Sequence, residues 1–277
     1  MTATPTLAGP LLRETPLPGV ALLRFGNAPQ GCFDEASEAA FEAALDALDA
    51  EPAIRVVVLA GGVPGVFVRH YDVGVLESRG RALAARGLRF DVARPVPEAP
   101  IHRCLRRIGE SARIFVAAID GVAMGGGCEI ALACDLRVAA DGDYPIGLPE
   151  VNIGLLPGAG GTQRLARLVG EAKALELILL GRTVGPREAA RLGIVNECVD
   201  GPALPRALEL AGRLAGQPPR ALAHVKRLVR QAFEGGDAGT LATGLAHERT
   251  RFCDLLVSGE AVARMHDMNQ GRRTIRD

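Results

Sequence analysis

Two carboxylates and a triple glycine occur close together in one stretch of the chain. Gly125, Gly126 and Gly127 directly precede a helical pattern that carries Glu129 in its first turn. Glycines at a helix start leave backbone N–H groups open to an approaching oxygen atom, which is how an oxyanion site is built. Glu150 follows 21 positions after Glu129 (150 − 129), so a return of the chain could bring both carboxylates to one pocket. Two acids that face an oxyanion donor suggest proton transfer next to a carbonyl group.

Each carboxylate also has a simpler interpretation. Glu129 has the apolar neighbours Ile130 and Leu132, so the pattern predicts a buried carboxyl group whose pKa can rise toward the range of an acid/base group. A glutamate in the first turn of a helix can instead only favour the helix dipole. Glu150 follows Pro149 and can equally be a surface acid. The combination of both acids with the glycine run favours a catalytic site.

Buried strands that lead into glycine loops are predicted to position these residues. Apolar runs typical of buried strands occur at residues 20–25, 56–60 and 115–119, and residues 34–49 have apolar side chains at helical spacing. The second and third runs are each followed by a glycine loop. This repetition favours an α/β fold with parallel strands.

Three motifs, which include the glycine run and both carboxylates, resemble in their sequence and order the crotonase family, whose members include enoyl-CoA hydratases and isomerases. They read VAAIDGVAMGGGCEIALACDLRVAA, LPEVNIGLLPGAGGTQRLARLVG and ALELILLGRTVGPREAARLGIVNECV. The match is strong over residues 114–199 and looser elsewhere. It implies a ββα spiral core, here residues 1–203, and a C-terminal helical trimerisation region, residues 204–277.

The resemblance also implies roles for individual residues. Glu129 would activate water, Glu150 would deliver a proton to the α-carbon, and the backbone N–H groups of Gly126 and Tyr71 would form the thioester oxyanion hole. Isomerases of the family typically keep only the second carboxylate, so the presence of both favours a hydratase. Substrate contacts are expected at His70, Asp72, Gly125, Gly127, Pro149 and Gly158.

One loop departs from the family pattern. The family reads roughly F-x-A-G-A-D, whereas this chain has Arg69, His70 and Tyr71 between Phe67 and Asp72. The substitutions fall where the family lets the pantetheine chain pass close to the backbone, so His70 is either a solvent-facing residue or an extra acid/base or thioester contact. Three alternatives to hydration therefore stay open: isomerisation, hydrolysis of a carbon–carbon bond in a diketone, and a noncatalytic binding role.

Composition limits the partners. Lys plus Arg and Asp plus Glu number 32 each, so no overall field draws the protein to nucleic acid or to an anionic membrane. Aromatic residues make up only 4% of the chain, which disfavours base stacking. The histidines and cysteines lack metal-ligand spacing, so we expect no metal and no cofactor other than the coenzyme A of the substrate. The first residues do not resemble a signal peptide, so we expect a cytoplasmic protein. The family resemblance implies assembly as a homotrimer or homohexamer.

Two basic segments remain. The segment 76–109 is rich in arginine, which indicates either a solvated helical face or a cluster for ligand phosphates. From residue 204 onward the pattern is almost entirely helical. Lys226 and Arg227 there resemble residues that reach a phosphate across a subunit boundary.

Overall fold

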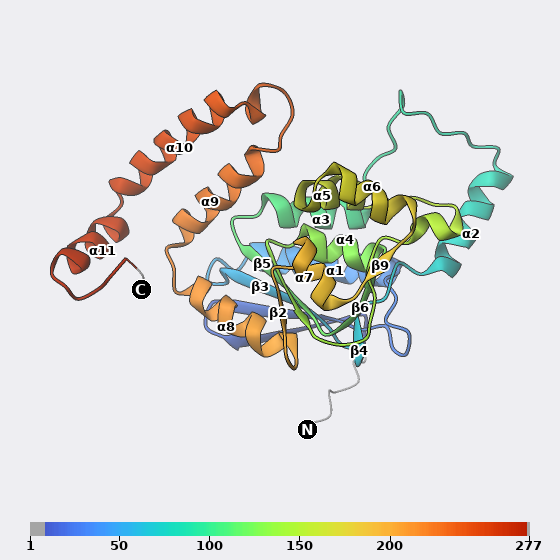
Figure 1. Cartoon of the computed structure of the whole chain (residues 1–277), viewed down its shortest axis with the longest axis horizontal. Coiled ribbons are helices and arrows are strands. Elements are labelled where there is room, and N and C mark those ends of the chain that lie inside the picture. The colour runs from blue at the N-terminus through green and yellow to red at the C-terminus, as the bar shows by residue number, and fades with distance from the viewer. Residues whose placement is uncertain (1–8, 276–277) are drawn as a thin grey trace.

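The computed structural model describes residues 9–275, and a six-stranded sheet forms its centre (Figure 1). The strand order is β1-β2-β3-β5-β7-β10, with β1 antiparallel to β2 and every other neighbouring pair parallel. These strands are β1 (Leu11–Leu17), β2 (Val20–Phe25), β3 (Val56–Gly61), β5 (Ile114–Ile119), β7 (Leu136–Ala140) and β10 (Glu197–Val199). The strands predicted at residues 20–25, 56–60 and 115–119 are confirmed.

A second, smaller sheet contains four short strands. They are β4 (Gly65–Val68), β6 (Gly121–Met124), β8 (Ile146–Gly147) and β9 (Thr183–Val184). The strands β3, β5 and β7 of the large sheet continue into β4, β6 and β8 of the small one, and a helix follows each pair. This is the ββα spiral that the sequence predicted. Gly121 stands where two turns of the spiral meet, because a Cβ atom there would lie 2.0 Å from the carbonyl carbon of Gly65.

Helices cover both faces of the large sheet (Figure 1). Those of the core are α1 (Glu35–Asp49), α2 (Val73–Ala85), α3 (Pro100–Glu110), α4 (Gly126–Ala133), η1 (Glu150–Ile153), α5 (Gly161–Val169), α6 (Glu171–Leu179), α7 (Pro186–Leu192) and α8 (Ala203–Ala215). The helix predicted at residues 34–49 is confirmed as α1, with Asp34 as its N-cap.

Alternate side chains of each central strand enter two different cores. In β3, Val57 and Leu59 pack toward α1, α3 and α4, whereas Val58 packs toward α8. Full burial of such a side chain contributes about 1.5–3 kcal/mol to folding. On α8, Ala207 and Ala211 are fully buried, and these small side chains let the helix lie close to the sheet. The domain boundary expected after residue 203 stays a prediction, but the packing of the core extends through α8.

Three helices beyond α8 extend away from the core (Figure 1). They are α9 (Pro219–Gln231), α10 (Leu241–Leu256) and α11 (Gly259–Asn269), with the short η2 (Gly236–Gly239) between the first two. Neither α10 nor α11 has a buried residue, and large apolar side chains such as Leu241, Phe252 and Val257 are more than 60% exposed. The helical prediction for this region is confirmed.

Lys226 points into its own chain. Its Nζ atom donates to the carbonyl oxygens of Ile108 (2.7 Å) and Arg113 (2.8 Å) and forms an ion pair with Asp135 (2.9 Å). Burial lowers the pKa of this ammonium group, and the Asp135 carboxylate opposes that shift. The expectation that Lys226 reaches a phosphate is therefore wrong. Arg227, its neighbour, pairs with Glu234.

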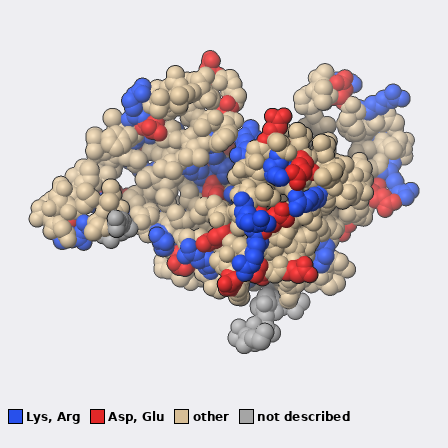
Figure 2. All heavy atoms as spheres, viewed as in Figure 1, with Lys and Arg blue, Asp and Glu red and all other residues tan. Residues whose placement is uncertain are grey.

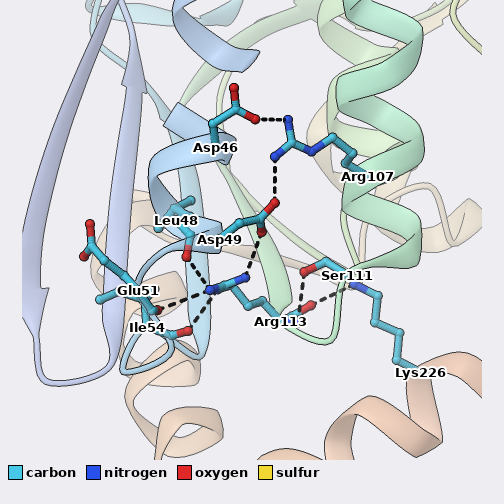
Figure 3. A network of polar contacts seen from close by, with 9 residues as sticks. All are labelled: Asp46, Leu48, Asp49, Glu51, Ile54, Arg107, Ser111, Arg113 and Lys226. Carbon is cyan, nitrogen blue, oxygen red and sulfur yellow. Dashed lines mark hydrogen bonds and ion pairs between the residues drawn. The ribbon is translucent and has the colours of Figure 1, made fainter. Parts of the chain in front are cut away.

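The same region contains a polar network that joins α1, α3 and α9 (Figure 3). The Arg113 guanidinium donates to the carbonyl oxygens of Leu48, Glu51 and Ile54. The Arg113 carbonyl oxygen also accepts a hydrogen bond from the Nζ atom of Lys226 on α9. This network fixes the first helix beyond α8 to the core.

Replacement of Lys226 by methionine is expected to destabilise the fold by about 3 kcal/mol, because it leaves buried oxygens of Ile108 and Arg113 without a donor and removes one partner of Asp135. The matched control is Arg227→Met, which removes an exposed ion pair and is expected to cost less than about 1 kcal/mol. Urea unfolding of the two variants measures the difference. Equal midpoints would contradict the structural role of Lys226.

The arginine-rich segment carries many ion pairs with acidic neighbours. Arg79, Arg103 and Arg107 pair with carboxylates of α1, at N–O distances of 2.7 to 2.8 Å. Figure 2 shows basic and acidic side chains interspersed over the face in view. Across residues 9–275, no helix has the length and apolar character that crossing a membrane requires.

Candidate active site

Three neighbouring strands of the small sheet end at the same place. The strands β4, β6 and β8 run parallel, so their carboxyl ends meet at one edge. Tyr71 follows β4 by three residues, Gly126 follows β6 by two, and Glu150 follows β8 by three. All three residues line one cavity of about 540 Å³, a volume typical of a small-molecule site.

Two backbone amides face this cavity without an acceptor. Gly126 is the first residue of α4, and Tyr71 lies in the loop between β4 and α2. Among the hydrogen bonds of residues 9–275, neither N–H group has an acceptor. The amides are close together, since a Cβ atom on Gly126 would lie 3.4 Å from the Tyr71 nitrogen. Two adjacent free N–H groups, one at a helix N-terminus, form a site for a developing oxyanion.

Glu129 lies on α4, one turn beyond Gly126, with only 3% of its surface exposed. Its Oε1 atom accepts hydrogen bonds from the backbone N–H groups of Ala159 (2.7 Å) and Gly161 (2.8 Å). Burial raises the pKa of this carboxyl group, and the two amides oppose the shift because they stabilise the ionised form. The PGAGG run, residues 157–161, thus holds the Glu129 carboxylate through two backbone N–H groups.

Glu150 has a different environment at the start of η1. Its Oε2 atom is buried without a hydrogen-bond partner among the described residues. Burial, reinforced by the charge of Glu129 and partly opposed by its own backbone N–H, raises the pKa of Glu150 to about 7. Its Oε1 atom lies 3.2 Å from the position of a Cβ atom on Gly125, beside the N-terminus of α4. With a pKa of about 7, the Glu150 carboxyl group can both hold and release a proton near neutral pH.

Most of the predicted substrate contacts line the same cavity. These are His70, Gly125, Pro149 and Gly158. His70 is half-buried, and because its Nδ1 atom lies 2.8 Å from the Tyr71 carbonyl oxygen, Nδ1 donates and Nε2 is left as an acceptor. His70 was expected to be either a solvent-facing residue or a group that contacts the substrate. Because it lines the cavity, the structure favours the second interpretation.

Two predicted contacts lie outside the lining of this cavity. Asp72 caps α2, with a carboxylate oxygen accepting from the Val75 N–H at 3.0 Å. Gly127 packs against β4, because a Cβ atom there would lie 1.9 Å from the Val68 carbonyl oxygen. Both residues therefore hold the backbone next to the cavity without lining it.

Four polar residues of the cavity, one of them Asn152 of η1, were not among the predicted site residues. Glu38 comes from α1, Arg79 from α2 and His102 from α3. The His102 Nδ1 atom accepts from the Ala99 N–H (2.9 Å), so Nε2 carries the proton and donates to the Gly158 carbonyl oxygen (2.9 Å). Nothing local in the sequence marks these side chains, since they reach the cavity through helix packing.

Comparison with known proteins agrees with this geometry. Residues 18–260 match the enoyl-CoA hydratase/isomerase family. The probable enoyl-CoA hydratase echA8 of Mycobacterium leprae is 36% identical over 77% of this chain and 76% of that protein. The probable mitochondrial enoyl-CoA hydratase 2 of Arabidopsis thaliana is 35% identical over 77% of this chain and 66% of that protein. The structure of an enoyl-CoA hydratase from Bacillus anthracis aligns with a TM-score of 0.81 at 27% identity, over 96% of this chain and 97% of that one.

The chain therefore belongs to the enoyl-CoA hydratase/isomerase family, the crotonases. Its α/β fold is the crotonase fold, and its cavity is that of a family whose substrates are acyl-CoA thioesters. The family contains both hydratases and isomerases, so membership leaves the reaction itself to be argued from the site.

Proposed function

We propose that this protein is an enoyl-CoA hydratase, which adds water reversibly across the α,β double bond of an acyl-CoA. The thioester oxygen accepts hydrogen bonds from the Gly126 and Tyr71 amides. Glu129 takes a proton from water, and the water oxygen forms a bond to the β-carbon. The electron pair of the double bond moves to the α-carbon and the thioester oxygen, and Glu150 then gives its proton to the α-carbon. Coenzyme A enters only as part of the substrate.

The observation that carries this proposal is the contrast between two carboxylates in one cavity. The Glu129 carboxylate accepts two backbone hydrogen bonds, which favour the ionised form that a base requires. Glu150 has an unpartnered oxygen and a pKa raised by burial to about 7, which favours the protonated form that an acid requires. Burial raises the pKa of both carboxyl groups, but two amide donors from another loop oppose the shift at Glu129. Such a difference between two neighbouring carboxyl groups is typical of an acid/base pair.

The two free amides supply the remaining requirement. Hydration places negative charge on the thioester oxygen, and loss of one such donor typically costs about 3 kcal/mol in the transition state. Gly126 and Tyr71 line the same cavity as the carboxylates, so two donors without an acceptor are available beside the reacting groups. An isomerase needs only one carboxylate for proton movement, so the second acid favours hydration.

Assembly and location are parts of the same proposal. The exposed apolar side chains of α10 and α11 suit an interface between copies of the chain, in a trimer or a hexamer. The cytoplasm is the proposed location.

The test is hydration of a series of enoyl-CoA thioesters, followed by loss of the conjugated thioester absorbance. We expect turnover of at least one chain length, with the 3-hydroxyacyl-CoA as the product identified by mass spectrometry. A shifted double bond without uptake of water would replace the proposal by isomerisation. Binding without any reaction would replace it by a noncatalytic role, and failure of every thioester to bind would direct the search to a diketone substrate.

A further inference from the structure

A third carboxylate reaches the same cavity from an unexpected direction. Glu38 lies on α1, in the apolar stripe that also contains Phe41 and Leu45. It is only 4% exposed, it lines the cavity, and its Oε1 atom has no hydrogen-bond partner among the described residues. An unsatisfied buried polar atom typically costs about 1–3 kcal/mol. An apolar residue would fit the stripe better, so the carboxyl group at this position requires another explanation.

The Tyr71 hydroxyl group is the second unsatisfied polar group here. Its oxygen is buried without a hydrogen-bond partner in residues 9–275. Its ring packs against Phe33, with ring centroids 6.1 Å apart. Burial and the charge of the nearby Glu38 raise the pKa of Tyr71 to about 12, so the hydroxyl keeps its proton. The two groups are neighbours, yet no hydrogen bond of good geometry joins them.

The neighbouring side chains limit what can bind between them. His102 has both ring nitrogens committed to backbone partners. Arg79 also lines the cavity and pairs with Glu35 at 2.8 Å, so its positive charge disfavours a cationic ligand group. Burial raises the pKa of Glu38, and the nearby Tyr71 hydroxyl and Arg79 guanidinium oppose that shift because they stabilise the ionised form. In that form the carboxylate only accepts hydrogen bonds, whereas a phenol both donates and accepts. A neutral group that donates to Glu38 and accepts from Tyr71 satisfies both, and a hydroxyl group has this character.

We propose that the acyl group of the substrate carries a hydroxyl group, remote from the thioester, which donates a hydrogen bond to Glu38 and accepts one from Tyr71. Apolar side chains including Val73, Leu76 and Ile101 line the cavity as well and contact the carbon skeleton. The inference rests on the proposed function for the thioester end of the substrate, because Tyr71 supplies its backbone N–H to the oxyanion hole and its side chain to this subsite. A site built to bind a hydroxyl group discriminates strongly against the analogue that lacks it.

The experiment measures binding with saturated acyl-CoA thioesters, which cannot be hydrated. Each chain length is used as a matched pair with and without a hydroxyl group, in one aliphatic series and in one series with a phenyl or hydroxyphenyl group. Calorimetry on the wild type is expected to show about tenfold or tighter binding of the hydroxylated member in at least one pair. The series in which this occurs tells an aliphatic alcohol from a phenol.

Two variants test the residues themselves. Glu38→Leu is expected to abolish the preference or reverse it, and to unfold at a higher urea concentration than the wild type. Tyr71→Phe keeps the backbone N–H and is expected to reduce the preference severalfold. The matched control is Glu42→Leu, on the same helix but outside the lining of the cavity, which should leave the preference unchanged.

The outcomes separate this inference from the proposed function. Equal affinities within every pair overturn the subsite, and they mean that water or a direct Glu38–Tyr71 contact satisfies the two groups. A clear hydroxyl preference without hydration of any enoyl-CoA supports the subsite and overturns the hydratase. Failure of every thioester to bind overturns both.

Discussion

Replacement of Glu150 by glutamine is expected to lower kcat for enoyl-CoA hydration by about 10²–10⁴-fold, the usual contribution of a general acid. Glutamine has nearly the same shape as glutamate but has no proton to give to the α-carbon. The same variant should lose exchange of the α-protons of a saturated acyl-CoA with deuterated water, since that exchange uses only this carboxyl group. Hydration rates and mass spectrometry of the exchanged thioester measure the two effects.

The pH dependence follows from the same residue. Hydration requires Glu150 in its protonated form, and burial raises its pKa to about 7. The rate of hydration in the wild type is therefore expected to fall as pH rises through about 7. A rate that stays constant or rises between pH 6 and 8 would contradict the assignment of Glu150 as the acid.

Stability provides the control for this variant. A carboxyl group whose pKa is higher in the folded state stabilises the fold below its unfolded pKa, and this stabilisation is lost as pH rises through the folded value. Glutamine is neutral at every pH, so Glu150→Gln should be at least as stable as the wild type above pH 7. A large loss of stability would mean that its inactivity reports damage to the fold.

The strands β2, β3 and β5 of the large sheet were predictable from the sequence because they are buried on both faces, whereas β1, β7 and β10 were not predicted. Runs such as residues 56–60 are continuously apolar, which is the pattern of a central parallel strand. The small sheet was missed because β8 and β9 have two residues each and carry no periodicity. The strand β4 was interpreted as part of a loop, because it has only four residues and directly follows Gly61, Gly62 and Pro64.

The two carboxylates proposed as catalytic, Glu129 and Glu150, could be found in the sequence because glycine runs accompany them. Glu38 was not recognised as a site residue, because the other acidic residues of α1 make this glutamate resemble part of a solvated face. Only the structure shows that this glutamate lines the cavity, next to the segment before α1 in which Phe33 pairs with Tyr71. The prediction for Lys226 was wrong for a related reason. Its buried partners, Ile108, Arg113 and Asp135, all lie about 90 or more positions earlier in the sequence.

Replacement of Glu129 by glutamine is expected to lower kcat for hydration by about 10²–10⁴-fold while leaving α-proton exchange largely intact. The amide oxygen of glutamine can still accept from the Ala159 and Gly161 N–H groups, so the loop keeps its place. What is lost is the negative charge that removes a proton from water. Exchange persists because Glu150 and the oxyanion hole remain.

Glu129→Ala is the matched comparison for this last variant. It removes the acceptor as well as the charge, which leaves two buried N–H groups unsatisfied at a cost of about 1–3 kcal/mol each. We expect both variants to lose hydration, but only the alanine variant to lose stability in urea and α-proton exchange together. If Glu129→Gln instead lost exchange while Glu150→Gln kept it, the two carboxylates would have the opposite roles. The retained exchange therefore determines which glutamate acts on water and which acts on carbon.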